Sequence, residues 1–516
     1  MATRSPSNFH NFWGQYSNIA SLPGVPSAEA NLQTGDTAYT TDTNTLYVCT
    51  DDTPGSVVWS ESGITELTGD VEAGPGSGSQ AATVVGIQNN PVSAATPNTG
   101  DVLVWDGTEW VPTSMTEFTA ANFDAFGRLR TSNPQTIFEG KTVYDAQPLY
   151  FAEQQTPAVG GPPAGSWSSS NACVTLSVAA NQSSVRQSRR YFNYQPGKSQ
   201  FILQTFNLNG LTPNVYKRAG YFDSTNGILF ELDGVGTLSP ATGTGPYFER
   251  RSGSATSTSR VHQSQWNIDK LDGTGPSGIN LAWDKTQILV IDFEWLGVGS
   301  VRCGFDVDGQ TVYAHRFDNA NVNTHVYMST PNLPVRWEIV GAAGLVGSAT
   351  VDCICAAVNS EGGVQSSGTQ YSYVRPDLTS NVAGGATRTL LSIRHTGAYP
   401  RITIVPINIS PCSDNNGVTS WELVYNPTFP VTAPTWGTIN QGYLDVDIDG
   451  QAVGGTVLEA GSFTNSVGAQ NLNLRDTTLT LGADVAGVSD VISLRIKNLS
   501  GGNQTYLASL AWIAVT

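Results

Sequence analysis

Two carboxylates, Asp292 and Glu294, stand two positions apart on a predicted strand and therefore share one of its faces. A rise of ~3.3 Å per residue separates them by roughly 7 Å. Acid pairs with a comparable spacing can cleave glycosidic bonds, one residue protonating the leaving oxygen while the other acts as base or nucleophile. Solvated residues at the end of a strand give the same pattern, and we expect this surface role rather than a catalytic one.

The run Asp445–Gly450 matches the front of a calcium-binding loop, D-x-D-x-D-G. Such a loop also needs a bidentate Glu at its twelfth position, which is Thr456 in this chain. An exposed strand that ends in an Asp-Gly turn explains the same letters. The sequence leaves calcium binding open, and we assign no metal site.

Other chemical motifs are incomplete. Residues 273–278 fit G-x-G-x-x-G, but a strand is expected after them, whereas phosphate binding needs the N-terminus of a helix there. The 5 His are scattered without metal-ligand spacing, and the 6 Cys form no disulfide framework. We therefore predict no catalytic residue, no cofactor and no enzymatic activity.

Paired residues of two other kinds have structural explanations. Cys353 and Cys355 lie two positions apart on a predicted strand, so we expect both thiols to pack on one face as small apolar groups. The basic pairs Arg189-Arg190 and Arg250-Arg251 are isolated in an acidic chain, and we expect interface or surface roles for them.

The composition is that of a folded, β-rich and turn-rich chain. Of its 516 residues, 39% are hydrophobic, only 13% are charged and 54 are Gly. The formal net charge of −17 disfavours binding to nucleic acid, which requires a basic surface. The most apolar stretch, residues 339–351, is shorter than the ~18 residues of a membrane span. No signal peptide is visible after Met1, so we expect synthesis in the cytosol and no membrane insertion.

The clearest strands lie in residues 286–317. Alternate residues from Leu289 to Trp295 form a wholly apolar face, which predicts a strand packed on a core. Two further alternating runs flank Asp308-Gly309, a dipeptide typical of a two-residue hairpin turn. Consecutive hairpins without helical periodicity favour an antiparallel β-sandwich or jelly roll, which we assign to residues 116–380.

Three other zones complete the predicted all-β fold. Residues 381–516, with strict alternation over Ile492–Lys497, predict a second, smaller sandwich. Residues 1–62 begin with an aromatic cluster, expected to form a short amphipathic turn, and continue as a β-hairpin. Residues 63–115 are rich in Gly and Pro, with a two-residue turn expected at Asp106-Gly107. So few apolar clusters cannot build a core, which leaves a flexible linker or a shaft shared between chains, and we favour the shaft.

Several runs in the large domain resemble structural proteins of tailed bacteriophage particles. The resemblance covers roughly residues 120–400, and the runs are Phe123–Ser132, Tyr144–Tyr150, Trp266–Gly273, Asp292–Gly299 and Tyr327–Pro334. Separately, the sequence from Leu67–Val71 to Gly107–Trp110 looks like the short shaft module of phage fibres, whose strands are generally interwoven between three chains. That family has no established catalytic residues, so the resemblance transfers none.

The resemblance implies a structural component of the virion, a homotrimeric fibre or appendage protein of the tail or capsid. Its N-terminal aromatic cluster is then expected to dock on other virion proteins, and its sandwiches to serve assembly or host-surface attachment, with a host glycan open as a partner. The alternative is a polysaccharide-degrading tailspike-type enzyme using Asp292 and Glu294, although no β-helical repeat is visible. The predicted docking residues are Phe9, Phe12, Trp13 and Tyr16.

Overall fold

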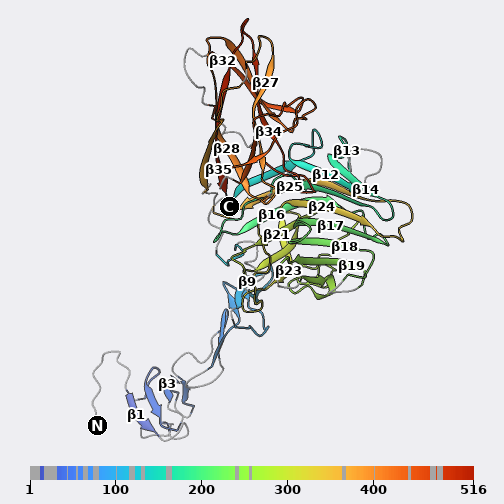
Figure 1. Ribbon diagram of the computed structural model, residues 1–516. Coiled ribbons are helices and arrows are strands. Elements are labelled where there is room, and N and C mark those ends of the chain that lie inside the picture. The colour runs from blue at the N-terminus through green and yellow to red at the C-terminus, as the bar shows by residue number, and fades with distance from the viewer. Residues whose placement is uncertain are drawn as a thin grey trace. The chain divides into compact units, whose positions relative to one another are not determined.

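The computed structural model describes residues 12–16, 22, 32–42, 45–53, 56–61, 68–73, 81–99, 101–114, 123–128, 134–157, 165–238, 243–254, 258–362, 368–379, 381–399, 401–439, 443–464, 472–473 and 480–515. Their regular elements are β-strands and one 3₁₀ turn, η2 (Gln263–Gln265), so the fold is all-β as the sequence predicts. No helix in this described part has the length and apolar character needed to cross a membrane. The chain divides into two compact units, residues 1–119 and 120–516 (Figure 1).

The first unit begins with a four-stranded sheet in the order β1-β2-β3-β4. β1 runs parallel to β2, so the aromatic cluster contributes a strand where a short amphipathic turn was expected. The other two pairs are antiparallel, and a small core of Leu22, Ala38 and Tyr47 supports the sheet. The strands are β1 (Phe12–Tyr16), β2 (Thr37–Thr40), β3 (Thr45–Asp51) and β4 (Val58–Glu61).

Three two-stranded hairpins follow in the first unit. In the last of them Trp105 pairs with Trp110, so the loop contains four residues where the expected turn has two. Asp106 Oδ1 closes this longer loop by accepting hydrogen bonds from the main-chain N–H groups of Thr108 and Glu109. The strands are β5 (Val71–Ala73), β6 (Ala82–Val84), β7 (Gly86–Ile87), β8 (Asn90–Pro91), β9 (Asp101–Trp105) and β10 (Trp110–Ser114).

The second unit contains a large sandwich of two antiparallel sheets. The eight-stranded sheet has the order β13-β14-β25-β16-β21-β22-β23, with β11 also pairing with β25, and the seven-stranded sheet has the order β12-β15-β24-β17-β18-β19-β20. The bounds are β11 (Gln135–Lys141), β12 (Phe151–Thr156), β13 (Gly165–Ser168), β14 (Cys173–Val178), β15 (Ser183–Ser188), β16 (Gln200–Asn207), β17 (Val215–Phe222), β18 (Gly227–Asp233), β19 (Gly245–Arg251), β20 (Ser259–His262), β21 (Gln287–Phe293), β22 (Val301–Val307), β23 (Gln310–Phe317), β24 (Val335–Gly341) and β25 (Ala349–Ser360).

The large sandwich confirms the strands expected around residues 286–317. Leu289, Ile291 and Phe293 on β21 are completely buried in the core between the sheets. β22 and β23 are joined by Asp308-Gly309, whose φ angles of 52° and 82° are both positive, as a type I′ turn requires.

A β-bulge changes the face to which side chains of β25 point. Thr205 of β16 pairs with Cys355, but the next residue of β16 pairs with Cys353, so β25 carries one extra residue there. Cys353 is therefore buried in the core, while Cys355 is only partly buried. The two thiols do not share a face, contrary to the expectation from their spacing, because an extra residue reverses the alternation.

A second sandwich completes this unit. Its sheets have the orders β26-β35-β28-β33 and β30-β31-β27-β34-β29-β32. Because β26 pairs with β35, this sandwich begins before the boundary expected between residues 380 and 381. The strands are β26 (Thr369–Val374), β27 (Thr387–His395), β28 (Thr403–Ser413), β29 (Val418–Tyr425), β30 (Gly437–Thr438), β31 (Leu444–Asp447), β32 (Thr456–Thr464), β33 (Leu472–Asn473), β34 (Ile492–Asn498) and β35 (Tyr506–Val515).

Candidate functional site

The aromatic cluster predicted to dock on the particle is only partly described. Phe9 lies outside the described residues, and Phe12, Trp13 and Tyr16 are described by their backbone in β1. β1 is a terminal strand of its sheet, and terminal strands can pair with a strand of another chain. The docking role itself stays a prediction.

Apolar side chains of the hairpins between β5 and β10 are exposed to solvent. Val84 is 56% exposed, and Val102 and Leu103 are 37% and 47% exposed. Neighbouring residues of a strand point to opposite faces, so β9 presents apolar groups on both sides. The short hairpins thus have no core of their own among the residues described here, as the sequence suggested.

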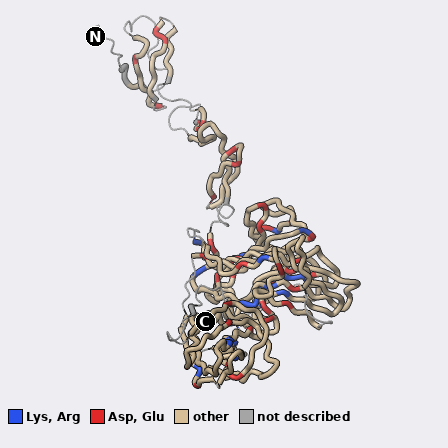
Figure 2. Tube along the Cα trace, turned by 90° about the horizontal axis from the view of Figure 1, so that it is seen from above, with Lys and Arg blue, Asp and Glu red and all other residues tan. Residues whose placement is uncertain are grey.

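The first unit is also strongly acidic. Residues 1–119 contain 13 Asp and Glu but a single basic residue, Arg4, which gives −12 of the net charge of −17. In the described residues of this unit Figure 2 shows acidic positions and no Lys or Arg, whereas both signs occur in the second unit. Any surface that receives the first unit is therefore favoured to be basic.

Asp292 does not lie on a solvated strand end, and the expectation of a surface residue is wrong. It is 0% exposed on β21. Its Oδ1 accepts a hydrogen bond from Ser199 Oγ at 2.6 Å, and its Oδ2 accepts from Arg302 Nη2 at 2.6 Å and from Tyr313 Oη at 2.8 Å. A segment far upstream in the sequence packs beside this ion pair, since Arg302 also donates a hydrogen bond to the main-chain oxygen of Phe123. This packing contributes to the burial of Asp292.

Glu294 has a different environment just beyond the end of β21. It is partly exposed, and its Oε1 accepts a hydrogen bond from the main-chain N–H of Ser300 at 2.9 Å. Partial burial raises its pKa, and the negative charges of Asp124 and Asp292 add to this effect. Asp292 is held in a buried ion pair and Glu294 is only partly exposed, so they do not form the solvent-facing acid pair considered from the sequence.

The acidic run Asp445–Gly450 is occupied by contacts within the second sandwich. Asp445 Oδ2 pairs with Arg394, and Asp445 Oδ1 accepts a hydrogen bond from Thr438. Asp447 is fully buried, and its Oδ1 accepts from the main-chain N–H groups of Thr435 and Gly450. Among the described residues no cluster of three or more His, Cys, Asp or Glu could hold a metal ion, and calcium binding gains no support.

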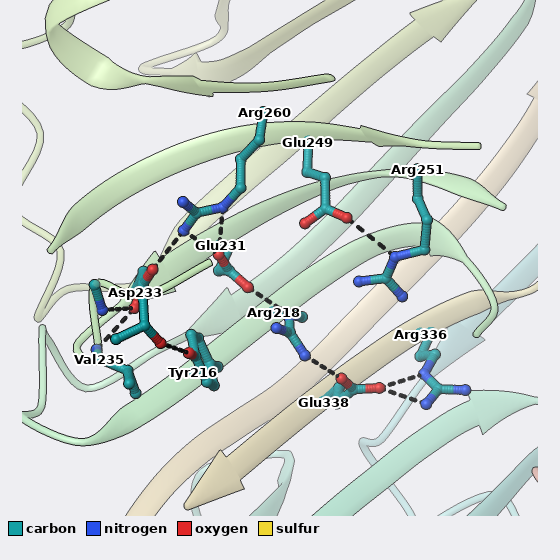
Figure 3. Close-up of polar contacts among 12 residues, drawn as sticks. Tyr216, Arg218, Glu231, Asp233, Val235, Glu249, Arg251, Arg260, Arg336 and Glu338 are labelled. Atoms are coloured by element: carbon teal, nitrogen blue, oxygen red, sulfur yellow. Dashed lines mark hydrogen bonds and ion pairs between the residues drawn. The ribbon is translucent and has the colours of Figure 1, made fainter. Parts of the chain in front are cut away.

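A charge ladder that the sequence analysis missed crosses the seven-stranded sheet. Guanidinium and carboxylate groups alternate along it, as Figure 3 shows. Arg260 Nη2 lies 2.6 Å from Asp233 and 2.5 Å from Glu231, and Arg218 joins Glu231 at 2.5 Å to Glu338 at 2.6 Å. Arg336 ends the ladder, its Nε lying 2.9 Å from Glu338. The members are Asp233, Arg260, Glu231, Arg218, Glu338 and Arg336.

The ladder is suited to holding strands together rather than to proton transfer. Burial alone would raise the pKa of Glu338, but Arg218, Arg336 and Arg251 outweigh burial and lower it to about 2. A general acid at neutral pH needs the opposite shift. The sequence signal was the alternation of charged residues at positions such as 336 and 338, but the members of the ladder come from four different strands, β24, β17, β18 and β20.

Comparisons with known proteins show no close relative. No family model matches the chain, and no curated protein matches its sequence. Similar solved structures include an uncharacterized protein from Mycobacterium paratuberculosis, with 14% identity, a TM-score of 0.30 and coverage of 43% of this chain and 99% of that one. A lectin from Bauhinia forficata in complex with GalNAc has 11% identity, a TM-score of 0.27 and coverage of 44% and 98%. A glycosyl hydrolase family protein from Mycobacterium fortuitum has 7% identity, a TM-score of 0.29 and coverage of 43% and 99%.

Proposed function

We propose that the chain is a structural appendage protein of a bacteriophage particle, with a self-associating first unit and a second unit that offers two β-sandwiches for assembly or host-surface attachment. The observation that carries the proposal is the hairpin β9–β10, where Val102 and Leu103 expose apolar groups on opposite faces. A two-stranded ribbon is marginally stable in water. Burial of both faces against other chains would stabilise it.

Identical copies are the partners that fit this surface. Each copy brings the same apolar hairpins, and closed rotational symmetry buries equivalent faces of every copy. The resemblance of residues 67–110 to phage shaft modules favours three copies. In the trimer, Val84 and Leu103 would face neighbouring chains rather than solvent.

The first unit also suits attachment to a particle. β1 is a terminal strand, and a strand from a virion protein could extend its sheet through main-chain hydrogen bonds. The net charge of −12 in residues 1–119 favours a basic receiving surface. Attachment by the first unit would leave the sandwiches available to other partners.

Light scattering on the full chain tests self-association. Three chains of 54.7 kDa give a mass of 3 × 54.7, about 164 kDa. Leu103→Asp should dissociate the assembly, because it places a charge in the proposed interface. Val346→Asp is the matched control, since Val346 is 93% exposed in the second unit and should tolerate the charge.

Two results would overturn this proposal. One is a monomeric wild-type chain, and protection of the amides of residues 101–114 from hydrogen exchange in that monomer would show that the hairpin needs no partner chain. The other concerns location: antibodies against the second unit should label appendages on tailed-phage particles in electron micrographs, and labelling of free protein alone would refute a virion role.

A further inference from the structure

A groove of about 800 Å³ lies between the two sandwiches of the second unit. One wall comes from the large sandwich, including Ile137, Tyr150 and Arg190, and the other from the second sandwich, including Leu458 and Glu459. A smaller hollow of about 480 Å³ shares five lining residues with it, so the two are continuous. The shared residues are Gln147, Leu149, Tyr150, Arg189 and Tyr425.

Direct contacts hold the two walls in place. Asp490 of the second sandwich is 2% exposed, and its Oδ1 accepts Arg189 Nη1 from the large sandwich at 2.7 Å. Asn426 Nδ2 donates to the same oxygen at 2.8 Å, and Tyr425 Oη donates to Oδ2. The main-chain N–H of Ala483 donates to the main-chain oxygen of Arg189 at 2.8 Å. The groove is therefore preformed, and Arg189 of the basic pair has an interface role, whereas Arg190 bonds within the large sandwich.

Each wall also carries a buried polar atom without a hydrogen-bond partner among the described residues. These atoms are Nε of Arg190 and Oε2 of Glu459. Arg190 is otherwise held by a bond from Nη1 to the main-chain oxygen of Ile137 at 3.3 Å, and burial lowers its pKa. Leaving such groups unpaired costs free energy, and the cost is larger when they are charged. Both atoms are shielded from solvent, so a ligand in the groove would reach them only after a small rotation of each side chain, and pairing them would recover that cost.

The lining defines the chemistry of this ligand. Arg190 Nε offers a donor and Glu459 Oε2 an acceptor, and one hydroxyl group can serve either of them. Tyr150, 43% exposed, and Leu149, 40% exposed, add an apolar surface for C–H groups. Charges of both signs line the groove. Arg189 is paired with Asp490, and Lys141 and Arg190 are balanced by Glu139 and Glu459, so no net charge favours an anion.

We propose that this groove binds a neutral oligosaccharide. Sugar rings combine hydroxyl groups that both donate and accept with apolar C–H faces. This matches the donor on Arg190 and the acceptor on Glu459 together with the apolar surface of Tyr150 and Leu149. The proposal deepens the proposed attachment function and rests on it for the biological source of the sugar. The groove's geometry supports it independently of self-association.

Calorimetric titration of the full chain tests the site. The probes are neutral hexasaccharides of glucose, mannose, galactose and N-acetylglucosamine, with a hexa-uronate and an acidic hexapeptide as comparisons. At least one neutral probe should bind, and Tyr150→Ala and Glu459→Gln should each weaken that binding tenfold or more. Tyr144→Ala and Glu422→Gln are matched controls outside the lining, and both should leave binding unchanged; Tyr144 is 86% exposed.

Several results would overturn the assignment. They are the failure of every neutral probe to bind, equal binding by Tyr150→Ala and wild type, or binding of the peptide or uronate in place of neutral sugars. Circular dichroism should show that the variants fold. Light scattering on the same samples separates the two proposals: sugar binding by a monomeric chain would refute the trimer alone, and a trimer without sugar binding would refute the groove alone.

Discussion

Replacing Asp292 by Asn should destabilise the large sandwich far more than replacing Glu294 by Gln. Asp292 is fully buried and accepts three side-chain hydrogen bonds, one of them from Arg302, whose side chain is 12% exposed. The amide keeps one oxygen but removes the charge opposite the guanidinium. Breaking a buried ion pair from one side costs about 3–5 kcal/mol. Glu294 is partly exposed and accepts one main-chain hydrogen bond, so its change should cost closer to the value of about 0.5 kcal/mol or less that is usual at the surface.

Urea unfolding of the full chain, followed by Trp fluorescence, measures the difference. With a slope of about 3 kcal/mol per molar urea, a loss of about 4 kcal/mol lowers the midpoint of the large sandwich by about 1.3 M. Glu294→Gln should move it by less than about 0.2 M. Equal midpoints for Asp292→Asn and wild type would refute the reasoning. Loss of host attachment or of glycan cleavage in either variant, with unchanged unfolding, would instead assign a functional role to the carboxylates.

Four further perturbations have defined outcomes. Phe293→Ala should cost about 3–5 kcal/mol in the same unfolding assay, since the ring is 0% exposed and leaves a cavity; a silent change would refute the register of β21. The folded-state pKa of Glu338 is lowered to about 2. Its contribution to stability is therefore complete above the unfolded pKa of about 4.3 and is lost as pH falls toward 2. Glu338→Gln should flatten the dependence of the unfolding free energy on pH in this range, and an unchanged dependence would contradict the role given to the charge ladder. Gly482→Ala would place a Cβ 2.6 Å from the main-chain oxygen of Arg189. The clash should weaken the contact between the two sandwiches, which small-angle scattering would detect as a changed curve, and an unchanged curve would count against close packing at Gly482. Deleting residues 1–20 should leave a folded trimer that no longer enters particles, whereas normal incorporation would reject the N-terminal docking role.

Local alternation predicted the strands well where one face meets a core. It predicted β21, the β22–β23 hairpin and the alternating strand β34, because each strand has apolar residues facing the core at every second position. It failed for Asp292 because the opposite face of β21 is also covered. Ser300 Oγ donates to the main-chain oxygen of Ala125, which places the segment around Ala125 near this end of β21. The residues next to Asp292 in the sequence do not indicate this long-range contact.

The remaining features depend on contacts between distant parts of the chain. The charge ladder joins residues between Arg218 and Glu338 that meet only when four strands assemble. The bulge at Cys355 reverses the face of β25 within an apolar run, residues 353–358, that gives no sign of it. The groove forms only when the two sandwiches pack together. The sequence therefore does not indicate that Arg190 and Glu459 line one groove, each with an unpaired polar atom. Pattern and spacing therefore predict strands better than they predict sites.

The uneven distribution of basic residues has a practical consequence. Between Arg4 and Arg128 the chain contains no Lys or Arg, so trypsin has no cleavage site across almost the whole first unit and should release it as one fragment, residues 5–128, whatever its folding state. The first Lys is Lys141. Amine-reactive dyes, cross-linkers and immobilisation chemistries will therefore modify side chains only in the second unit. The chain can then be coupled to a surface through its sandwiches while the side chains proposed to mediate association stay unmodified.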